Sequence, residues 1–173
     1  MTSIRRKMSD MMTISQILEK MIVLSKGNIH DVDHLIRVWT YAKTIGELEG
    51  LDKDTQFILE AAAITHDIAC PLCREKYGDT NGKYQEAEGS LLVRDFLANT
   101  GMTQEQIDRI TYLVGHHHTF QGIEGTDYQI LIEADYIANA SENGYSENSI
   151  RNFMEKWAKT ESGKQLIKGV FCL

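Results

Sequence analysis

Apolar residues recur at helical spacing along almost the whole chain, and this pattern constrains the fold more than any other feature. Phe57, Ala61 and Ile64, for example, lie at i, i+4 and i+7 on one helical face. The strict alternation of apolar and polar residues that marks a strand is hard to find. No linker, repeat or shift of composition divides the helical segments. The sequence therefore predicts an all-α fold, a single helical bundle of six to eight helices.

Residues that favour helix starts and helix ends place the expected helices. Two capping boxes, beginning at Thr13 and Thr103, each start a helix. Further helices are expected over about 31–48, 54–67, 83–99 and 127–140, after Ser146, and over 164–171. Residues 70–83 contain Pro71 and several glycines and asparagines, so we expect a loop there that could cover a site. Residues 1–27 should contain an N-terminal helix that packs on residues 28–173, within one structural domain overall.

Composition and charge exclude several classes of protein. With 18 basic and 25 acidic residues, the net charge is −7 and the pI is near 5.3, which argues against bulk binding of nucleic-acid phosphates. The longest apolar runs have four residues, too few to cross a membrane, and Arg5, Arg6 and Lys7 precede no signal-peptide core. Three cysteines give an odd count, so a disulfide framework is not expected. These features predict a soluble, cytoplasmic protein, and the sequence is compatible with a homo-oligomer.

Ionisable residues interrupt the apolar faces of three expected helices. His34 shares a face with Val38, His66 and Asp67 end the apolar stripe of the third helix, and Asp135 sits within the apolar segment 130–140. A lone histidine on such a face is more often a hydrogen-bonded core residue than a ligand. A buried carboxylate without a partner, however, costs several kcal/mol. If two imidazoles and two carboxylates surround a divalent cation, the cation neutralises the carboxylates and binds the lone pairs of the imidazoles.

These residues carry a family resemblance. His34 lies in the stretch Asp33–Val38, the pair His66-Asp67 in Ala63–Ile68, and Asp135 in Glu133–Tyr136. Their order and spacing resemble the HD superfamily of metal-dependent phosphohydrolases, named for the His-Asp pair. The resemblance covers roughly residues 28–170.

The resemblance implies an all-helical HD domain that hydrolyses a phosphoester, often of a nucleotide. It implies a divalent metal held by His34, His66, Asp67 and Asp135, with Mn, Fe, Co, Ni, Mg and Zn all compatible with the ligands. Catalysis by metal-activated water would need no amino-acid nucleophile, and Asp67 would orient that water. Arg37, one turn after His34, would contact the phosphate or pair with a carboxylate.

Some members of this superfamily hold a second metal, and the present chain departs from their pattern. One of their extra histidines stands four residues before a glycine, a position that corresponds here to Gln85, counted back from Gly89. Glutamine is a poorer transition-metal ligand than imidazole, which weakens the expectation of a complete second site and of redox chemistry. His116 and His117 would complete a weaker second site or contact phosphate, or a histidine run could simply form a solvated helix end.

Other residues near the His-Asp pair allow further interpretations. Lys76 and Lys83 flank the glycine-rich stretch and are candidates for contacts with substrate phosphate. Glu86 and Glu88 are candidate general acids, although glutamates near a helix start also favour the helix dipole. Cys70 and Cys73 form a C-x-x-C pattern, but a zinc site would need a second pair.

Two classes of function follow. The first is a metal-dependent phosphohydrolase that cleaves a small phosphorylated substrate, with a nucleotide as the favoured class. The second is a regulatory module that binds metal and nucleotide but turns over slowly, and Gln85 is its main support. The complete set of four ligands favours the enzyme.

Overall fold

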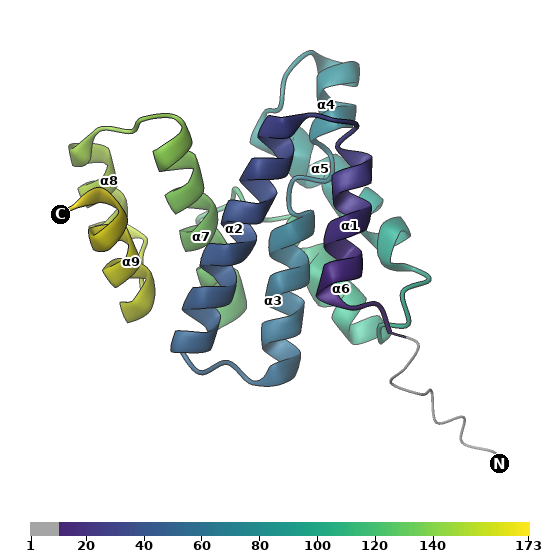
Figure 1. Cartoon of the computed structure of the whole chain (residues 1–173), viewed down its shortest axis with the longest axis horizontal. Helices are drawn as coiled ribbons and strands as arrows, with labels where there is room; N and C mark the ends of the chain where they lie inside the picture. Colours follow the sequence, from purple (N-terminus) through teal and green to yellow (C-terminus); the bar gives the residue numbers. More distant parts are fainter. Residues whose placement is uncertain (1–10) are drawn as a thin grey trace.

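Nine helices form the fold of residues 11–173, the part of the chain that the computed structural model describes (Figure 1). The expected all-α class is confirmed, and the described residues contain no strand. The helices are α1 (Ile14–Leu24), α2 (Ile29–Leu48), α3 (Lys53–Thr65), α4 (Cys70–Tyr77), α5 (Gly82–Leu97), α6 (Gln104–Val114), α7 (Thr126–Glu142), α8 (Glu147–Lys156) and α9 (Glu161–Phe171).

Helices α2, α3 and α7 form the centre of the bundle. Helix α2 packs along both α3 and α7, and α3 also packs against α6 and α7. Around this centre, α1 packs on α3, α5 pairs with α6, and α8 and α9 lie beside each other next to α7 (Figure 1). Helix α3 buries every residue from Ile58 to Thr65, as expected of a helix that is enclosed on all sides. Polar side chains on α3 and α7 must therefore find partners inside the protein.

The segment 70–83 differs from its expected loop. Residues Cys70–Tyr77 form helix α4, which ends at Gly78 with a left-handed φ of 75°. Pro71 occupies the first turn of α4, where its missing N–H breaks no helical hydrogen bond. The proline thus begins a new helix as well as ending the previous one, and the connecting loop is confined to residues 78–81.

Helix α1 belongs to the same core. Ile17 and Met21 of α1 are buried among residues of the central helices, and both predicted capping boxes, at Thr13 and Thr103, are present. Arg5, Arg6 and Lys7 lie outside the described residues. Among the described helices, none combines the length and the apolar character that a membrane crossing requires.

Candidate metal centre

The four expected metal ligands come together from three parts of the fold. Nε2 of His34, on α2, lies 3.2 Å from Nε2 of His66 and 3.2 Å from Oδ1 of Asp135 on α7. Oδ2 of Asp67 lies 3.6 Å from the same His34 nitrogen. His66 Nε2 is 3.5 Å from Asp135 Oδ1. His34, His66 and Asp67 form a group whose ligand atoms all lie within 4.8 Å of one another.

The end of helix α3 allows His66 and Asp67 to point to the same place. Neighbouring residues inside a helix point about 100° apart. Helix α3 ends at Thr65, and residues 66–69 form a turn held by bonds from Ile68 N–H to Thr65 O and from Cys70 N–H to Asp67 O. The helix end that Pro71 predicted therefore lies where the pair needs it.

Three histidines are oriented through their Nδ1 atoms. His66 and His117 each donate Nδ1–H to a backbone carbonyl, of Ala63 and Val114 respectively, at 2.7 Å. His34 directs Nδ1 at Glu142 Oε2, 2.9 Å away. A carbonyl can only accept, so His66 and His117 carry their proton on Nδ1 and keep a lone pair on Nε2. This arrangement, with the outer nitrogen bonded and the inner one free, is the usual one for metal-bound histidines.

A second group adjoins the first and shares Asp67 with it. Asp67, His117 and His118 also offer three ligand atoms within 4.8 Å of one another, and His117 Nε2 lies 3.4 Å from Asp67 Oδ1. Seven buried side-chain polar atoms in the described residues lack a hydrogen-bond partner, and four of them belong to this region: Asp67 Oδ1, Gln85 Oε1, His117 Nε2 and His118 Nε2. Such a concentration of unpaired acceptor atoms is costly unless a cation or a ligand satisfies it.

The pKa shifts of His34 and Asp135 reflect the close packing of lone pairs and negative charges at the centre. Burial lowers the pKa of His34, but the hydrogen bond with Asp135 and the charges of Asp67, Asp135 and Glu142 outweigh burial and raise it to about 10. Burial raises the pKa of Asp135, yet the neighbouring imidazoles of His34 and His66 bring that pKa well below its ordinary value. The centre favours positive charge beside its carboxylates, which a divalent cation would supply.

The pKa values of the two histidines in the second group shift in opposite directions. Burial disfavours the charged form of His117, but the Asp67 carboxylate beside it raises its pKa. Burial and the neighbouring His117 lower the pKa of His118 to about 4. His118 is therefore neutral at physiological pH and keeps a lone pair for a ligand. The donor set as a whole, imidazole nitrogens with carboxylates, fits a divalent transition metal or Mg²⁺.

A polar cavity of about 230 Å³ opens onto the centre. Besides His34, Asp67, His118 and Asp135, its lining residues are His30, Asp31, Cys70, Arg74, Thr80, Gln85, Asn139 and Asn143. Cys70 and Cys73 are both buried free thiols, and burial raises the pKa of each, so neither is activated as a thiolate.

The other candidate contacts divide into those at the cavity and those away from it. Gln85 lines it, and its amide is fixed by the bond from Nε2 to the carbonyl of Thr80, at 2.7 Å. Arg37 does not line it. Arg37 is half exposed, and its Nε lies 3.9 Å from Glu142 Oε1, so the carboxylate pairing is the one the structure contains. His116 instead bonds the carbonyl of Tyr112 and lies outside both ligand groups.

The lysines and glutamates of the 76–88 region make structural contacts. Lys76 binds Glu88 Oε1 at 2.5 Å, Lys83 is exposed, and neither lysine lines the cavity. Glu86 accepts hydrogen bonds from His118 N–H and the Thr119 hydroxyl, each at 3.0 Å. Glu86 thus fixes the turn that carries the histidines, and it does not line the cavity as a general acid would.

Sequence reasoning missed several residues of the site. His118 was left unassigned because three adjacent histidines do not reveal which of them point inward. Asn139 and Asn143 follow Asp135 at i+4 and i+8, so helical spacing could have identified them. Glu142, which orients His34, is seven residues after Asp135, so helical spacing could have identified it as well.

Comparison with known proteins assigns the family. The model of the HD domain matches residues 31–152, a range that includes all four expected ligands. The chain therefore belongs to the HD domain family. A solved structure described as a predicted HD superfamily hydrolase, from an uncultured Thermotogales bacterium, matches with a TM-score of 0.70 and 19% sequence identity. The match covers 99% of this chain and 92% of the other, and it supports the shared fold. No curated protein matches the chain.

Proposed function

We propose that this protein is a metal-dependent phosphohydrolase that cleaves the phosphoester of a small molecule with metal-activated water. One observation carries the proposal. Histidine lone pairs and carboxylate oxygens converge from α2, α3, α7 and the turn after α6, and they leave unpaired buried atoms at their centre. Membership of the HD family agrees with this function.

The residues of the chain have distinct parts in this proposal. His34, His66, Asp67 and Asp135 would hold one cation, while Asp67, His117 and His118, with the amide oxygen of Gln85, would hold a second. When bound, a divalent cation lowers the pKa of water and polarises a phosphoryl oxygen. Asp67 faces both groups through its two oxygens, and in this proposal it would orient the attacking water while it remains a ligand.

The surrounding residues hold these ligands in position. Glu142 and the carbonyls of Ala63 and Val114 set the orientation of three imidazoles, and Asn139 Nδ2 donates to Asp135 Oδ1 at 2.8 Å. Such outer contacts change metal affinity or activity by about 10- to 100-fold when removed. A nucleotide as substrate and a cytoplasmic location stay predictions.

The test combines metal analysis with a substrate screen. The purified protein is loaded with Mn²⁺, Co²⁺, Ni²⁺ or Mg²⁺, its metal content is measured, and phosphate release is followed with nucleotides and with other phosphoesters. We expect metal-dependent release by the wild type and loss of about 10³-fold or more in Asp67→Ala, because activation of water by a metal supplies several kcal/mol. Equal, slow release by both proteins, with metal bound to the wild type, would instead favour the regulatory module.

A further inference from the structure

The cavity above the metal centre is lined mainly by polar side chains. Its twelve lining residues include no aliphatic residue and no Phe, Tyr or Trp, and Cys70 is its least polar member. Its volume of about 230 Å³ is below the roughly 300–1,000 Å³ typical of small-molecule sites. A purine or pyrimidine usually gains its affinity by stacking on aromatic faces, as in single-stranded nucleic-acid binding. The aromatic rings of the lining are the imidazoles of His30, His34 and His118, and two of these belong to the ligand groups, so a base would find no Phe, Tyr or Trp face here.

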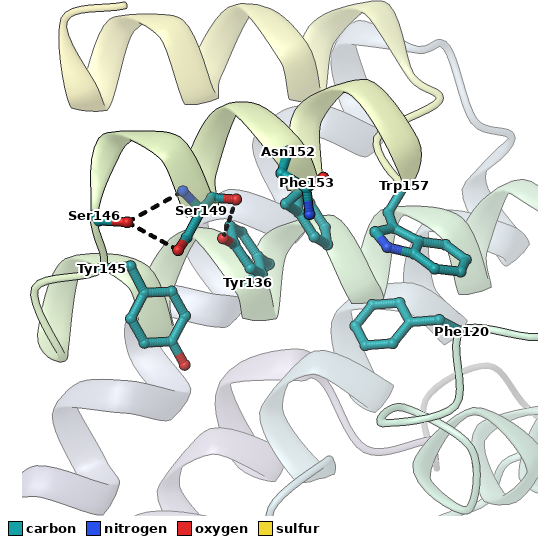
Figure 2. Close-up of a pocket in the computed structure, with 8 residues that line it drawn as sticks. All are labelled: Phe120, Tyr136, Tyr145, Ser146, Ser149, Asn152, Phe153 and Trp157. Atoms are coloured by element: carbon teal, nitrogen blue, oxygen red, sulfur yellow. Dashed lines mark hydrogen bonds between the residues drawn. The ribbon is translucent and has the colours of Figure 1, made fainter.

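Aromatic surface does exist in this protein, in a different cavity. Figure 2 shows Phe120, Tyr136, Tyr145, Phe153 and Trp157 around a cavity beside α8. The volume of this cavity is about 460 Å³. Phe120 packs on Trp157 with ring centroids 5.3 Å apart, and Tyr136 stacks on Phe153. This aromatic cavity shares no lining residue with the polar cavity at the metal centre.

Uncommitted hydrogen-bond acceptors line the polar cavity along α7. Asn139 uses its Nδ2 to donate to Asp135 Oδ1, and Asn143 uses its Nδ2 to donate to the carbonyl of Asn139, at 2.9 Å. These bonds fix the orientation of both amides, since an amide nitrogen can only donate. Neither Oδ1 atom accepts a hydrogen bond from the described residues, and Asn139 is partly buried while Asn143 is exposed at the rim. Such oxygens suit a ligand that brings hydroxyl donors.

Positive charge in the cavity is limited. Arg74, the one Lys or Arg side chain among the lining residues, forms a two-point ion pair with Asp31. Lys76 and Lys83 do not line the cavity. Polyphosphates are usually held by several cationic side chains in addition to metal. Beyond the cations of the centre, this cavity therefore offers at most one cationic side chain to a phosphate, and that side chain is already paired with Asp31.

We infer that the substrate is a phosphomonoester of a small polyhydroxylated molecule, a sugar or polyol phosphate, whose hydroxyls bind the Asn139 and Asn143 oxygens. This inference rests on the proposed function. In the reaction, the oxygen of water forms a bond to phosphorus, the bond between phosphorus and the sugar oxygen breaks, and that oxygen takes up a proton. The products are the free sugar or polyol and inorganic phosphate.

A matched pair of substrates tests the inference. Ribose 5-phosphate and adenosine 5′-monophosphate share the phosphorylated ribose and differ by the base. With Mn²⁺-loaded protein, we expect kcat/KM to be about 10-fold or more higher for ribose 5-phosphate. Asn143→Ala should raise the KM for ribose 5-phosphate about 3- to 10-fold, the effect of one lost hydrogen bond, with kcat little changed. Asn152→Ala, in the aromatic cavity, is the matched control and should leave both constants unchanged.

Binding measurements separate this inference from the proposed function. Calorimetric titration of the Mn²⁺-loaded wild type with each compound gives affinities whether or not turnover occurs. Binding of ribose 5-phosphate without hydrolysis of any ester would refute the hydrolase and support the substrate class. Preference of the wild type for adenosine 5′-monophosphate, in binding or in kcat/KM, would overturn the inference. If the Trp157→Ala variant then lost that preference, the base would bind in the aromatic cavity. Failure of both compounds to bind or react would also overturn it.

Discussion

Glu133 and Asp135 are buried carboxylates two residues apart on helix α7, and their surroundings differ. Glu133 is fully buried, and the protein satisfies both its oxygens. Oε1 accepts from Gln129 Nε2, from Lys159 N–H and from Thr160 N–H, at 2.7, 2.7 and 3.1 Å, while Oε2 accepts from the Thr160 hydroxyl. Glu133 thereby anchors the residue that caps α9. Its contacts account for its burial without any ligand.

Asp135 is nearly as deeply buried, but its partners are fewer and two of them are histidines of the metal centre. Asn139 supplies one donor, and the other neighbours of Asp135 are the Nε2 atoms of His34 and His66, 3.2 and 3.5 Å away. His66 keeps a lone pair on that nitrogen, because its proton is on Nδ1. The difference teaches that burial of a charge does not identify a site. Unpaired polar atoms nearby do, and four of them lie in the adjoining region around Asp67.

The largest expected effect comes from changing the carboxylate that faces the histidines. Asp135→Asn should lower metal-dependent activity about 100-fold or more, close to 3 kcal/mol, because an amide oxygen is a weaker ligand than a carboxylate. The amide can still accept from Asn139 and donate to a histidine nitrogen, so the metal-free Tm should change little. Metal titration and thermal unfolding check both statements. Full metal affinity in this variant would remove Asp135 from the ligand set.

The corresponding carboxylate-to-amide substitution at Glu133 should lower stability and leave metal binding unchanged. Glu133→Gln places an NH₂ group against the donors of Lys159 and Thr160, which should cost about 2 kcal/mol of unfolding free energy. For a domain of this size, that corresponds to a Tm lower by about 4–8 °C. Thermal unfolding and measured metal content are the readouts. A loss of bound metal from the folded variant would contradict the division between the two carboxylates.

At the metal centre, a proton and the metal cation compete for His34, and no such competition is expected at Glu133. With its pKa raised to about 10, His34 holds a proton at neutral pH in the metal-free protein. A cation must displace that proton, so metal affinity should rise about tenfold per pH unit, near 1.4 kcal/mol, between about pH 7 and 9. Competition with a chelator at several pH values measures the slope. A metal affinity that does not change with pH would show that metal binding releases no proton. The stabilising contribution of protonated His34, conversely, is complete below pH 6.5 and is lost as pH rises through 10.

The smallest effect is expected at the turn that presents His117 and His118. The hydroxyl of Tyr128 lies 2.7 Å from the carbonyl of His116 and 2.6 Å from that of Thr119. Tyr128→Phe should cost about 1 kcal/mol of stability by removing this contact. It should also weaken the second metal site more than the first, since the turn carries ligands of the second group alone. Metal stoichiometry at limiting Mn²⁺ tests this, and equal weakening of both sites would contradict it.

Much of the fold could be predicted because its signals are local. Helical spacing, the capping residues at Thr13 and Thr103, and the proline after Asp67 act within a few residues, and all appear in the structure. Helix α4 was missed because a proline can end one helix and begin another, and the outcome depends on what packs against the segment. The family pattern also placed His34, His66, Asp67 and Asp135 in one group.

The sequence by itself determined that this chain is helical, that its buried histidines and aspartates need one another, and that it resembles HD proteins. Only the tertiary structure decided which of the histidines at 116–118 turn inward, that Gln85 leaves a buried oxygen unpaired, and that Asn139 and Asn143 line the cavity. The physical reason is that helix formation depends on neighbours in the chain. A ligand set depends on where helices cross and on which hydrogen bonds have already been made.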